Sequence, residues 1–131
     1  MNTLLRRTAV VLSVLCAGAG TPPTLWAHPE PLTVVMVDNR FEPDHLVFQA
    51  GRAYALTLVN RGTDMHEFTA PAFLKSATVR DPRLLSNGGT DIVVQPGKSV
   101  RVLLIPRKKG TFDLTCADHD WDGMVGGITV K

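Results

Sequence analysis

Cysteine is scarce in this sequence, with only Cys16 and Cys116 among 131 residues. Residues 1–27 have the layout of a secretory signal, and their removal would leave Cys116 as the single thiol of the exported chain. A single thiol excludes an internal disulfide. In an oxidising compartment a lone thiol is buried, pairs with another molecule or binds a metal, so its neighbours in the sequence decide its role.

An excess of positive charge is also missing. Without Arg6 and Arg7, which lie in the predicted signal, 12 Lys and Arg residues remain against 12 Asp and Glu residues. Nucleic-acid binders need clustered basic side chains to neutralise phosphates, so this balance excludes that class of partner. Charged residues make up 20% and hydrophobic residues 44% of the chain, which is typical of a packed globular domain.

No apolar run is long enough to span a bilayer. Arg6 and Arg7 precede an apolar run at residues 9–15 and then a stretch of small residues, an order typical of a cleaved export signal. We therefore expect cleavage after Ala27, a periplasmic location and no membrane span in the mature form. The remaining residues, 28–131, are enough for one domain and too few for two.

Sustained helical periodicity is absent after the signal, whereas short β-type segments between turn residues are frequent. The expected strands cover residues 32–37, 45–50, 53–59, 92–95, 99–105, 110–116 and 127–130. Their number and spacing predict an all-β, two-sheet Greek-key sandwich of about seven to eight strands. Gly51-Arg52 predicts a tight hairpin, and the basic run 107–109 a second hairpin turn. The long connection 71–90 has no expected strand, although residues 72–77 are compatible with one helical turn.

The chemistry-bearing residues lie near the carboxyl end, directly after an expected strand. Cys116 is followed by His119 and Met124, so one loop carries a thiol, an imidazole and a thioether. His66 follows the expected strand 53–59, and a sandwich can bring that strand end beside the Cys116 loop. Two His and one Cys with a weak axial Met form the ligand set that suits copper and one-electron chemistry. Closed zinc sites more often use four strong N or S ligands.

From about residue 32 to residue 131 the sequence resembles the cupredoxins, the blue copper family that includes plastocyanin and pseudoazurin. The resemblance rests on the Cys-x2-His-x4-Met spacing and on four further segments, residues 39–43, 50–51, 58–60 and 124–130. It implies one copper per chain. It also implies a ligand set in which the first three residues are equatorial and the last is axial: His66, Cys116, His119 and Met124.

Three features depart from the pattern of many plastocyanin-like members. Glu67 follows the first ligand where those members have Asn, which bears on the hydrogen bonds around the Cys116 sulfur and on the reduction potential. Residues 117–118 lack the Pro often found there. Where many relatives present an apolar docking face, His119 is surrounded by carboxylates: Asp118, Asp120 and Asp122. The resemblance therefore does not identify the partner.

Of four other residues with notable side chains, two are interpreted as structural and two have a role that stays open. His45 begins an expected strand and is interpreted as an edge residue, and Met65 points away from His66 if that segment is extended. His28 would become the amino terminus after cleavage, where its amine and imidazole together can bind Cu(II). Trp121 either packs beneath the site or is an exposed docking residue.

Two functions fit these features. The first is a periplasmic one-electron carrier with a type 1 copper site, whose partner is a redox protein such as a c-type cytochrome. The second is a periplasmic copper-handling or copper-resistance protein that binds copper or passes it to a copper-trafficking protein. Cupredoxin-related oxidases and nitrite reductases need further copper sites and domains, so we expect no enzyme activity. We also expect the mature protein to be a monomer.

Overall fold

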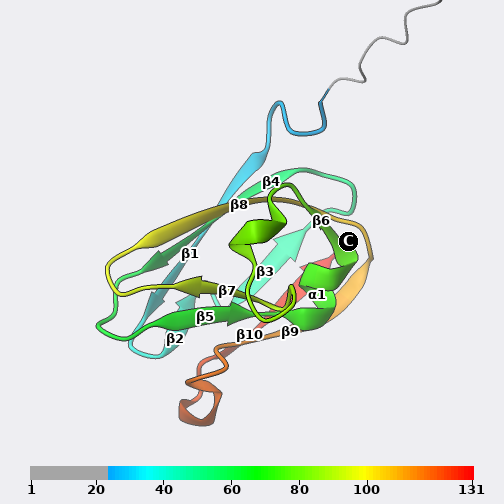
Figure 1. Ribbon diagram of the computed structural model, residues 1–131. Helices are drawn as coiled ribbons and strands as arrows, with labels where there is room; N and C mark the ends of the chain where they lie inside the picture. The colour runs from blue at the N-terminus through cyan, green and yellow to red at the C-terminus, as the bar shows by residue number, and fades with distance from the viewer. Residues whose placement is uncertain (1–23) are drawn as a thin grey trace, which may run out of the picture.

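The computed structural model describes residues 24–131, so residues 1–23 of the predicted export signal lie outside the described part of the chain. Within that part, two sheets of five strands each pack face to face (Figure 1). The predicted all-β two-sheet Greek-key sandwich is confirmed. The described residues contain ten strands because three short ones, of three or four residues each, add to the seven predicted segments.

The two sheets differ in their strands and in their strand order. The first has the order β2-β1-β4-β8-β6 and consists of β1 (Glu30–Val37), β2 (Arg40–Glu42), β4 (Tyr54–Asn60), β6 (Ala77–Val79) and β8 (Ser99–Pro106). The second has the order β3-β10-β9-β5-β7 and consists of β3 (His45–Phe48), β5 (His66–Thr69), β7 (Asp91–Val94), β9 (Gly110–Thr115) and β10 (Val125–Val130). The β1–β4 and β3–β10 pairs are parallel and the other pairs are antiparallel.

Alternation of side chains along the strands decides which face of each sheet is buried. In β8, exposed Arg101 is followed by Val102, which is fully buried. In β4, Leu56 and Leu58 are fully buried two residues apart. Phe48 and Phe68 of the second sheet join this interior, and burying one such side chain stabilises the fold by about 1.5–3 kcal/mol. The core therefore gives the loops at its ends a rigid support.

The predicted hairpin at Gly51-Arg52 is wrong, because β3 belongs to the second sheet and β4 to the first. The connection instead crosses between the sheets, where Ala50 N–H donates to Lys131 O at 2.9 Å and Gly51 N–H donates to Pro106 O at 2.8 Å. Alternating polarity indicates which face of a strand is buried but not which strand lies beside it. Gly51 does make the turn, with a φ of +80° that glycine adopts without strain.

The second expected hairpin, around residues 107–109, is also a crossing between sheets, because β8 and β9 lie in different ones. Arg107 Nε donates to Thr78 Oγ1 at 2.9 Å in this connection. No functional role follows for the run itself.

The long connection 71–90 contains a strand after all, since β6 pairs with the edge of β8. The helical turn expected at residues 72–77 is present as helix α1 (Pro71–Ser76). Phe73 and Leu74 of α1 are buried, and the centroids of the Phe73 and Phe48 rings lie 5.1 Å apart. These contacts anchor the connection to the core. A single 3-10 turn, η1 (Pro82–Leu84), follows β6.

The topology brings three strand ends together at one end of the sandwich. Thr69 of β5 pairs with Thr115 of β9 in antiparallel register, which carries the start of β5 alongside the residues that follow β9. β9 and β10 are antiparallel neighbours, and the loop that joins them projects beyond the sheets (Figure 1). Within the described residues, no helix has the length and apolar composition needed to cross a membrane.

Candidate metal centre

Cys116 follows β9 directly and is completely buried. Its backbone N–H donates to Met124 O at 3.0 Å, and its carbonyl accepts from His119 N–H at 3.0 Å. Met124 N–H in turn donates to His119 O at 3.1 Å. The three residues of the predicted motif are thus tied together through the backbone of one compact loop, which contains the 3-10 turn η2 (Asp120–Asp122).

His66 is the first residue of β5, and only 2% of its surface is exposed. A Cβ atom added to Gly62 would lie 3.1 Å from His66 Nε2, so the missing side chain of Gly62 leaves room for the imidazole ring. The next residue, Glu67, donates its backbone N–H to Cys116 Sγ at 3.3 Å. The start of β5 therefore contacts the Cys116 side chain through both the His66 ring and the Glu67 backbone.

Asn60 braces the segment that leads to His66. Only 1% of its surface is exposed, and its side-chain amide donates to Asp64 O at 2.8 Å and to Val94 O at 2.9 Å. Its Oδ1 accepts from Gly62 N–H at 2.8 Å. This bracing role was not predicted from the sequence. The available signal was a buried-strand pattern that ends in an amide and is followed two residues later by glycine.

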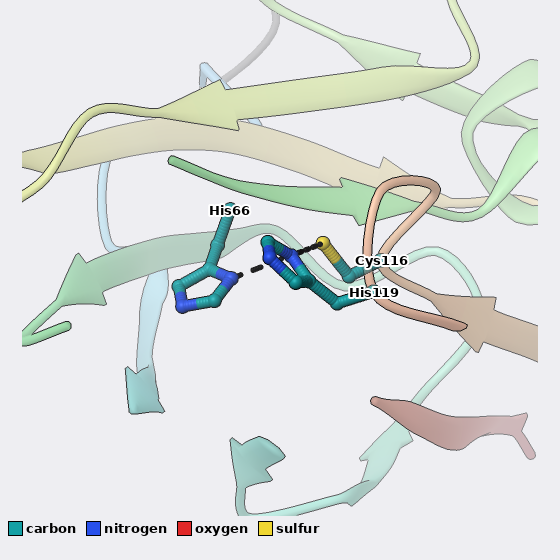
Figure 2. A group of neighbouring side chains, drawn as sticks. All are labelled: His66, Cys116 and His119. Atoms are coloured by element: carbon teal, nitrogen blue, oxygen red, sulfur yellow. Dashed lines mark hydrogen bonds between the residues drawn. The ribbon is translucent and has the colours of Figure 1, made fainter. Parts of the chain in front are cut away.

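The structure brings His66, Cys116 and His119 together, with one ligand atom of each lying within 4.8 Å of the others. Figure 2 shows both imidazole rings beside the Cys116 sulfur, with Nδ1 of His66 at 3.9 Å and Nδ1 of His119 at 3.4 Å from Sγ. For a metal bound by nitrogen at about 2.0 Å and by thiolate at about 2.3 Å, a trigonal arrangement separates N and S by roughly 3.8 Å. The three side chains therefore fit one metal ion with little rearrangement.

Met124 is fully buried at the start of β10, and its backbone binds both Cys116 and His119. These contacts place it at the same end of the sandwich as the three other predicted ligands. Its role as an axial ligand stays a prediction. The donor set of two imidazoles, a thiol and a thioether mixes borderline and soft ligands, which is the chemistry that suits copper.

Burial controls the protonation of the site. It lowers the pKa of His66, and the nearby His119 lowers it further, while Asp64 acts in the opposite direction. Burial also raises the pKa of the Cys116 thiol, although backbone N–H groups of Glu67, Asp118 and His119 oppose that effect. At neutral pH the metal-free site therefore holds a neutral His66 and a protonated thiol. Those backbone N–H groups are placed to stabilise a thiolate once a cation replaces the thiol proton.

Glu67 is an unusual residue to find at this depth. It is 7% exposed, and its Oε2 has no hydrogen-bond partner in the described part of the chain. Burial raises the pKa of this carboxyl, and the negative charges of Asp118 and Asp91 raise it further. Backbone N–H groups of Ala117 and Asp118 partly offset the rise. The departure noted in the sequence thus places a titratable group directly behind the Cys116 loop.

The outer surface of the same loop is acidic and aromatic. Asp118, Asp120 and Asp122 are exposed around half-buried His119. Trp121 is 80% exposed, and its Nε1 donates to Asp118 O at 2.8 Å. Of the two alternatives for Trp121, the structure selects the exposed one.

The two other histidines of the described residues, His45 and His28, are not part of the cluster. His45 begins edge strand β3, as expected, and its Nε2 lies 3.0 Å from Thr129 Oγ1. His28 is exposed just before β1, whose first residue pairs with Tyr54, whereas Asn60 and the His66 segment adjoin the far end of that strand pair. Met65 is half-buried and directly precedes His66 in the chain, and it keeps its interpretation from the sequence.

Comparison with known proteins identifies the class to which this fold and site belong. A family model described as a cupredoxin-like domain matches residues 8–130, and the chain therefore belongs to that family. The search of curated proteins found no match.

Solved structures with the same fold include two auracyanins and an amicyanin. Auracyanin B is 19% identical with a TM-score of 0.59, covering 79% of this chain and 91% of its own. The dithionite-reduced auracyanin of the photosynthetic bacterium Roseiflexus castenholzii is 15% identical with a TM-score of 0.59, covering 79% of this chain and 98% of its own. A Cu(I) form of an amicyanin point mutant is 18% identical with a TM-score of 0.51, covering 79% of this chain and 85% of its own. The likeness to these structures is one of fold.

Proposed function

We propose that this protein is a periplasmic one-electron carrier with a single type 1 copper. His66, Cys116 and His119 would be its equatorial ligands and Met124 its axial ligand. The observation that carries the proposal is the clustering of one thiol and two imidazole nitrogens within 4.8 Å in a buried, braced site. Copper supplies one-electron chemistry when it is bound by such a mixed set of ligands.

The residues at the site have distinct tasks in this function. Cys116 and His66 are held in the core, away from water, and Asn60 limits the movement of the segment before His66. A rigid ligand set limits the rearrangement that a change of oxidation state would otherwise require. His119 is half-buried and is the ligand nearest the acidic outer surface, so it is the natural point of exchange with a partner.

The fold relatives support a redox function. One of the auracyanin structures is that of a dithionite-reduced protein, and the amicyanin structure is that of a Cu(I) form. These states belong to those proteins, and we extend the redox function to this chain because it carries the ligand types for copper at one end of the same fold. The periplasmic location rests on the signal-like residues 1–27, and the mass of the exported protein tests it.

Copper titration of the purified domain tests the assignment. Cu(II) is expected to produce an intense visible band from thiolate-to-copper charge transfer, since Cys116 is the only thiol among residues 28–131. Cys116→Ser should abolish the band. His45→Gln is the matched control, because His45 is an exposed imidazole outside the cluster, and it should keep the full band. An unchanged band in Cys116→Ser would overturn the site.

Potentiometry of the copper-loaded protein separates the carrier from a copper-handling protein. A fast, reversible one-electron couple supports the carrier. Tight copper retention without a reversible couple, or ready transfer of the metal to a copper-trafficking protein, would instead favour copper handling and contradict the proposal.

A further inference from the structure

A basic hollow of about 610 Å³ lies at the edge of the first sheet. Its side chains come from the end of β6, from η1 and from the outer face of β8, and none of them is a candidate copper ligand. Three of them are arginines: Arg80, Arg83 and Arg101. Volumes of about 300–1,000 Å³ are typical of pockets for small molecules.

The backbone fixes the position of two of these arginines. Arg80 N–H donates to Leu103 O at 2.9 Å, which continues the pairing of β6 with β8 by one residue. Arg101 and Leu103 lie two positions apart on β8, so their side chains share the outer face of the sheet. Across the ladder, Arg101 faces Thr57, so its neighbour on β4 brings no negative charge.

The third arginine is held in place by the only acidic residue of the hollow. Asp81 accepts from Arg83 Nε at 2.8 Å and from Arg83 Nη2 at 2.9 Å, and the Arg83 guanidinium lowers the pKa of that carboxyl. Neither Arg80 nor Arg101 forms an ion pair with any residue in the range 24–131. With Asp81 ionised, the three arginines leave the hollow with a net charge of +2.

The lining also has an apolar part. Leu84 is 38% exposed, and Leu103 is half-buried beside it in the same lining, together with Pro82. A guanidinium binds phosphate through two parallel N–H donors, and apolar lining favours a ligand that carries hydrocarbon beside its charge.

We propose that this hollow binds a phosphate monoester with an apolar substituent, its dianionic group between Arg80 and Arg101 and its substituent against Leu84 and Leu103. The charge of a dianion matches the net charge of the hollow, and the apolar lining distinguishes an ester from inorganic phosphate. The same chemistry occurs in a free ester and in the headgroup of phosphatidic acid. The proposal is independent of the copper function, because the hollow and the metal centre share no residue.

Titrations of the folded domain with inorganic phosphate and with butyl phosphate, followed by NMR, test the proposal. Butyl phosphate should bind saturably and more tightly than inorganic phosphate, with the largest shifts at Arg80, Arg101 and Leu84. Flotation with phosphatidylcholine vesicles, with and without phosphatidic acid, tests the lipid as the source of the ligand. If the domain binds vesicles that contain phosphatidic acid but does not bind butyl phosphate, the ligand is the lipid headgroup. Saturable binding in either assay supports the proposal, and its absence in both overturns it.

Matched variants separate a built site from general attraction of anions. Arg80→Gln with Arg101→Gln removes two charges from the hollow, and Lys108→Gln with Lys109→Gln removes two exposed charges outside it. The first pair should weaken binding by about tenfold or more, because it removes the charge-assisted hydrogen bonds to the phosphate, while the second should change it little. Equal weakening by both pairs would overturn the proposal. Leu84→Ser should reduce the preference for butyl phosphate over inorganic phosphate, and these readouts should be the same with and without copper.

Discussion

The Cys116 sulfur shows how single residues from distant parts of the chain define the site. It accepts from the Glu67 backbone at 3.3 Å and lies within 4 Å of one nitrogen each of His66 and His119. Met124 is bound to the same loop through its backbone. Substitutions of these residues should therefore change the properties of the copper, and those of Cys116 and Met124 also alter the buried core to which both side chains belong.

Met124→Leu should retain the copper and its colour but raise the reduction potential. The thioether is a weak donor, and its removal destabilises the oxidised state more than the reduced one. Visible spectroscopy and potentiometry of the copper-loaded variant check this expectation. Loss of all copper binding would show that Met124 is instead a primary ligand.

Glu67→Gln should make the metal-free protein more stable at neutral pH. Because burial raises the pKa of Glu67 in the folded state, the folded state binds more protons than the unfolded state above the ordinary value of 4.5. The free energy of unfolding therefore falls as the pH rises from that value through the raised folded pKa. The neutral Gln removes this dependence.

Urea unfolding of metal-free wild type and Glu67→Gln between about pH 4 and about pH 8 measures the difference. The two curves should converge at acidic pH and separate as the pH rises. Asp113→Asn serves as the control, since it removes an exposed carboxylate of β9 and should show no such separation. If the free energy of unfolding depends on pH in the same way in wild type and Glu67→Gln, ionisation of Glu67 does not destabilise the folded state and the prediction is wrong.

The segment between β4 and β5 positions the metal centre through its backbone. Asn60 holds it by three hydrogen bonds, and Gly62 gives His66 the space for its ring. The β9–β10 loop is similarly compact, and Gly123 with a φ of +86° ends its 3-10 turn. The site thus depends on two loops whose geometry the sandwich fixes at both ends.

Gly62→Ala should disturb the copper site without unfolding the protein. The added Cβ would lie 3.1 Å from His66 Nε2 and 3.3 Å from Asn60 Oδ1, so the imidazole must shift. We expect copper affinity to fall by about tenfold or more, as for other groups that orient metal ligands, and the free energy of unfolding of the apo-protein to change by less than about 1 kcal/mol.

Copper titration and thermal melts of Gly62→Ala measure the two effects. Thr63→Ala, a substitution at the exposed neighbouring position, should leave both unchanged. Wild-type copper affinity in Gly62→Ala would show that the His66 ring does not need this space.

Charge is unevenly distributed over the molecule as a whole. Acidic side chains surround His119 at one end, whereas the arginines of the hollow lie at the edge of the first sheet. Because residues 28–131 carry equal numbers of acidic and basic side chains, local fields govern the approach of charged partners. The acidic end favours a partner with a basic rim around its own redox centre.

Electron exchange with a basic c-type cytochrome should slow as ionic strength rises, because exposed charges are screened over about 10 Å at 0.1 M salt. Replacing Asp118, Asp120 and Asp122 with Asn should lower the rate at low salt by about tenfold and flatten its salt dependence. The copper spectrum should remain nearly intact. Stopped-flow kinetics at several salt concentrations measure these rates.

The matching control replaces a remote carboxylate, Asp113→Asn, and should retain the wild-type salt dependence. Rates that are indifferent to salt in wild type and triple variant alike would point to apolar docking through Trp121, which is 80% exposed beside these carboxylates, or to a partner in copper handling.

The sequence by itself determined the class of fold and predicted the residue types of the metal centre. Alternating β-type segments and frequent turn residues predicted the sandwich, because side-chain periodicity in a strand is local. The predicted ligands Cys116, His119 and Met124 share one loop, so their relation was also local. His66 lies 50 residues away, and its link to the others depended on the expected sandwich and on family resemblance.

Only the tertiary structure decided which strands are neighbours and what surrounds the ligands. Both expected hairpins, at Gly51-Arg52 and at residues 107–109, proved to be crossings between sheets, because a turn signal does not specify the partner of the next strand. The short strand β6 forms because the edge of β8 is available to pair with it, which its three residues do not indicate. The brace at Asn60 and the hollow around Arg80 and Arg101 likewise arise from contacts between segments far apart in the chain. Such contacts depend on the register of the assembled sheets, which no local pattern encodes.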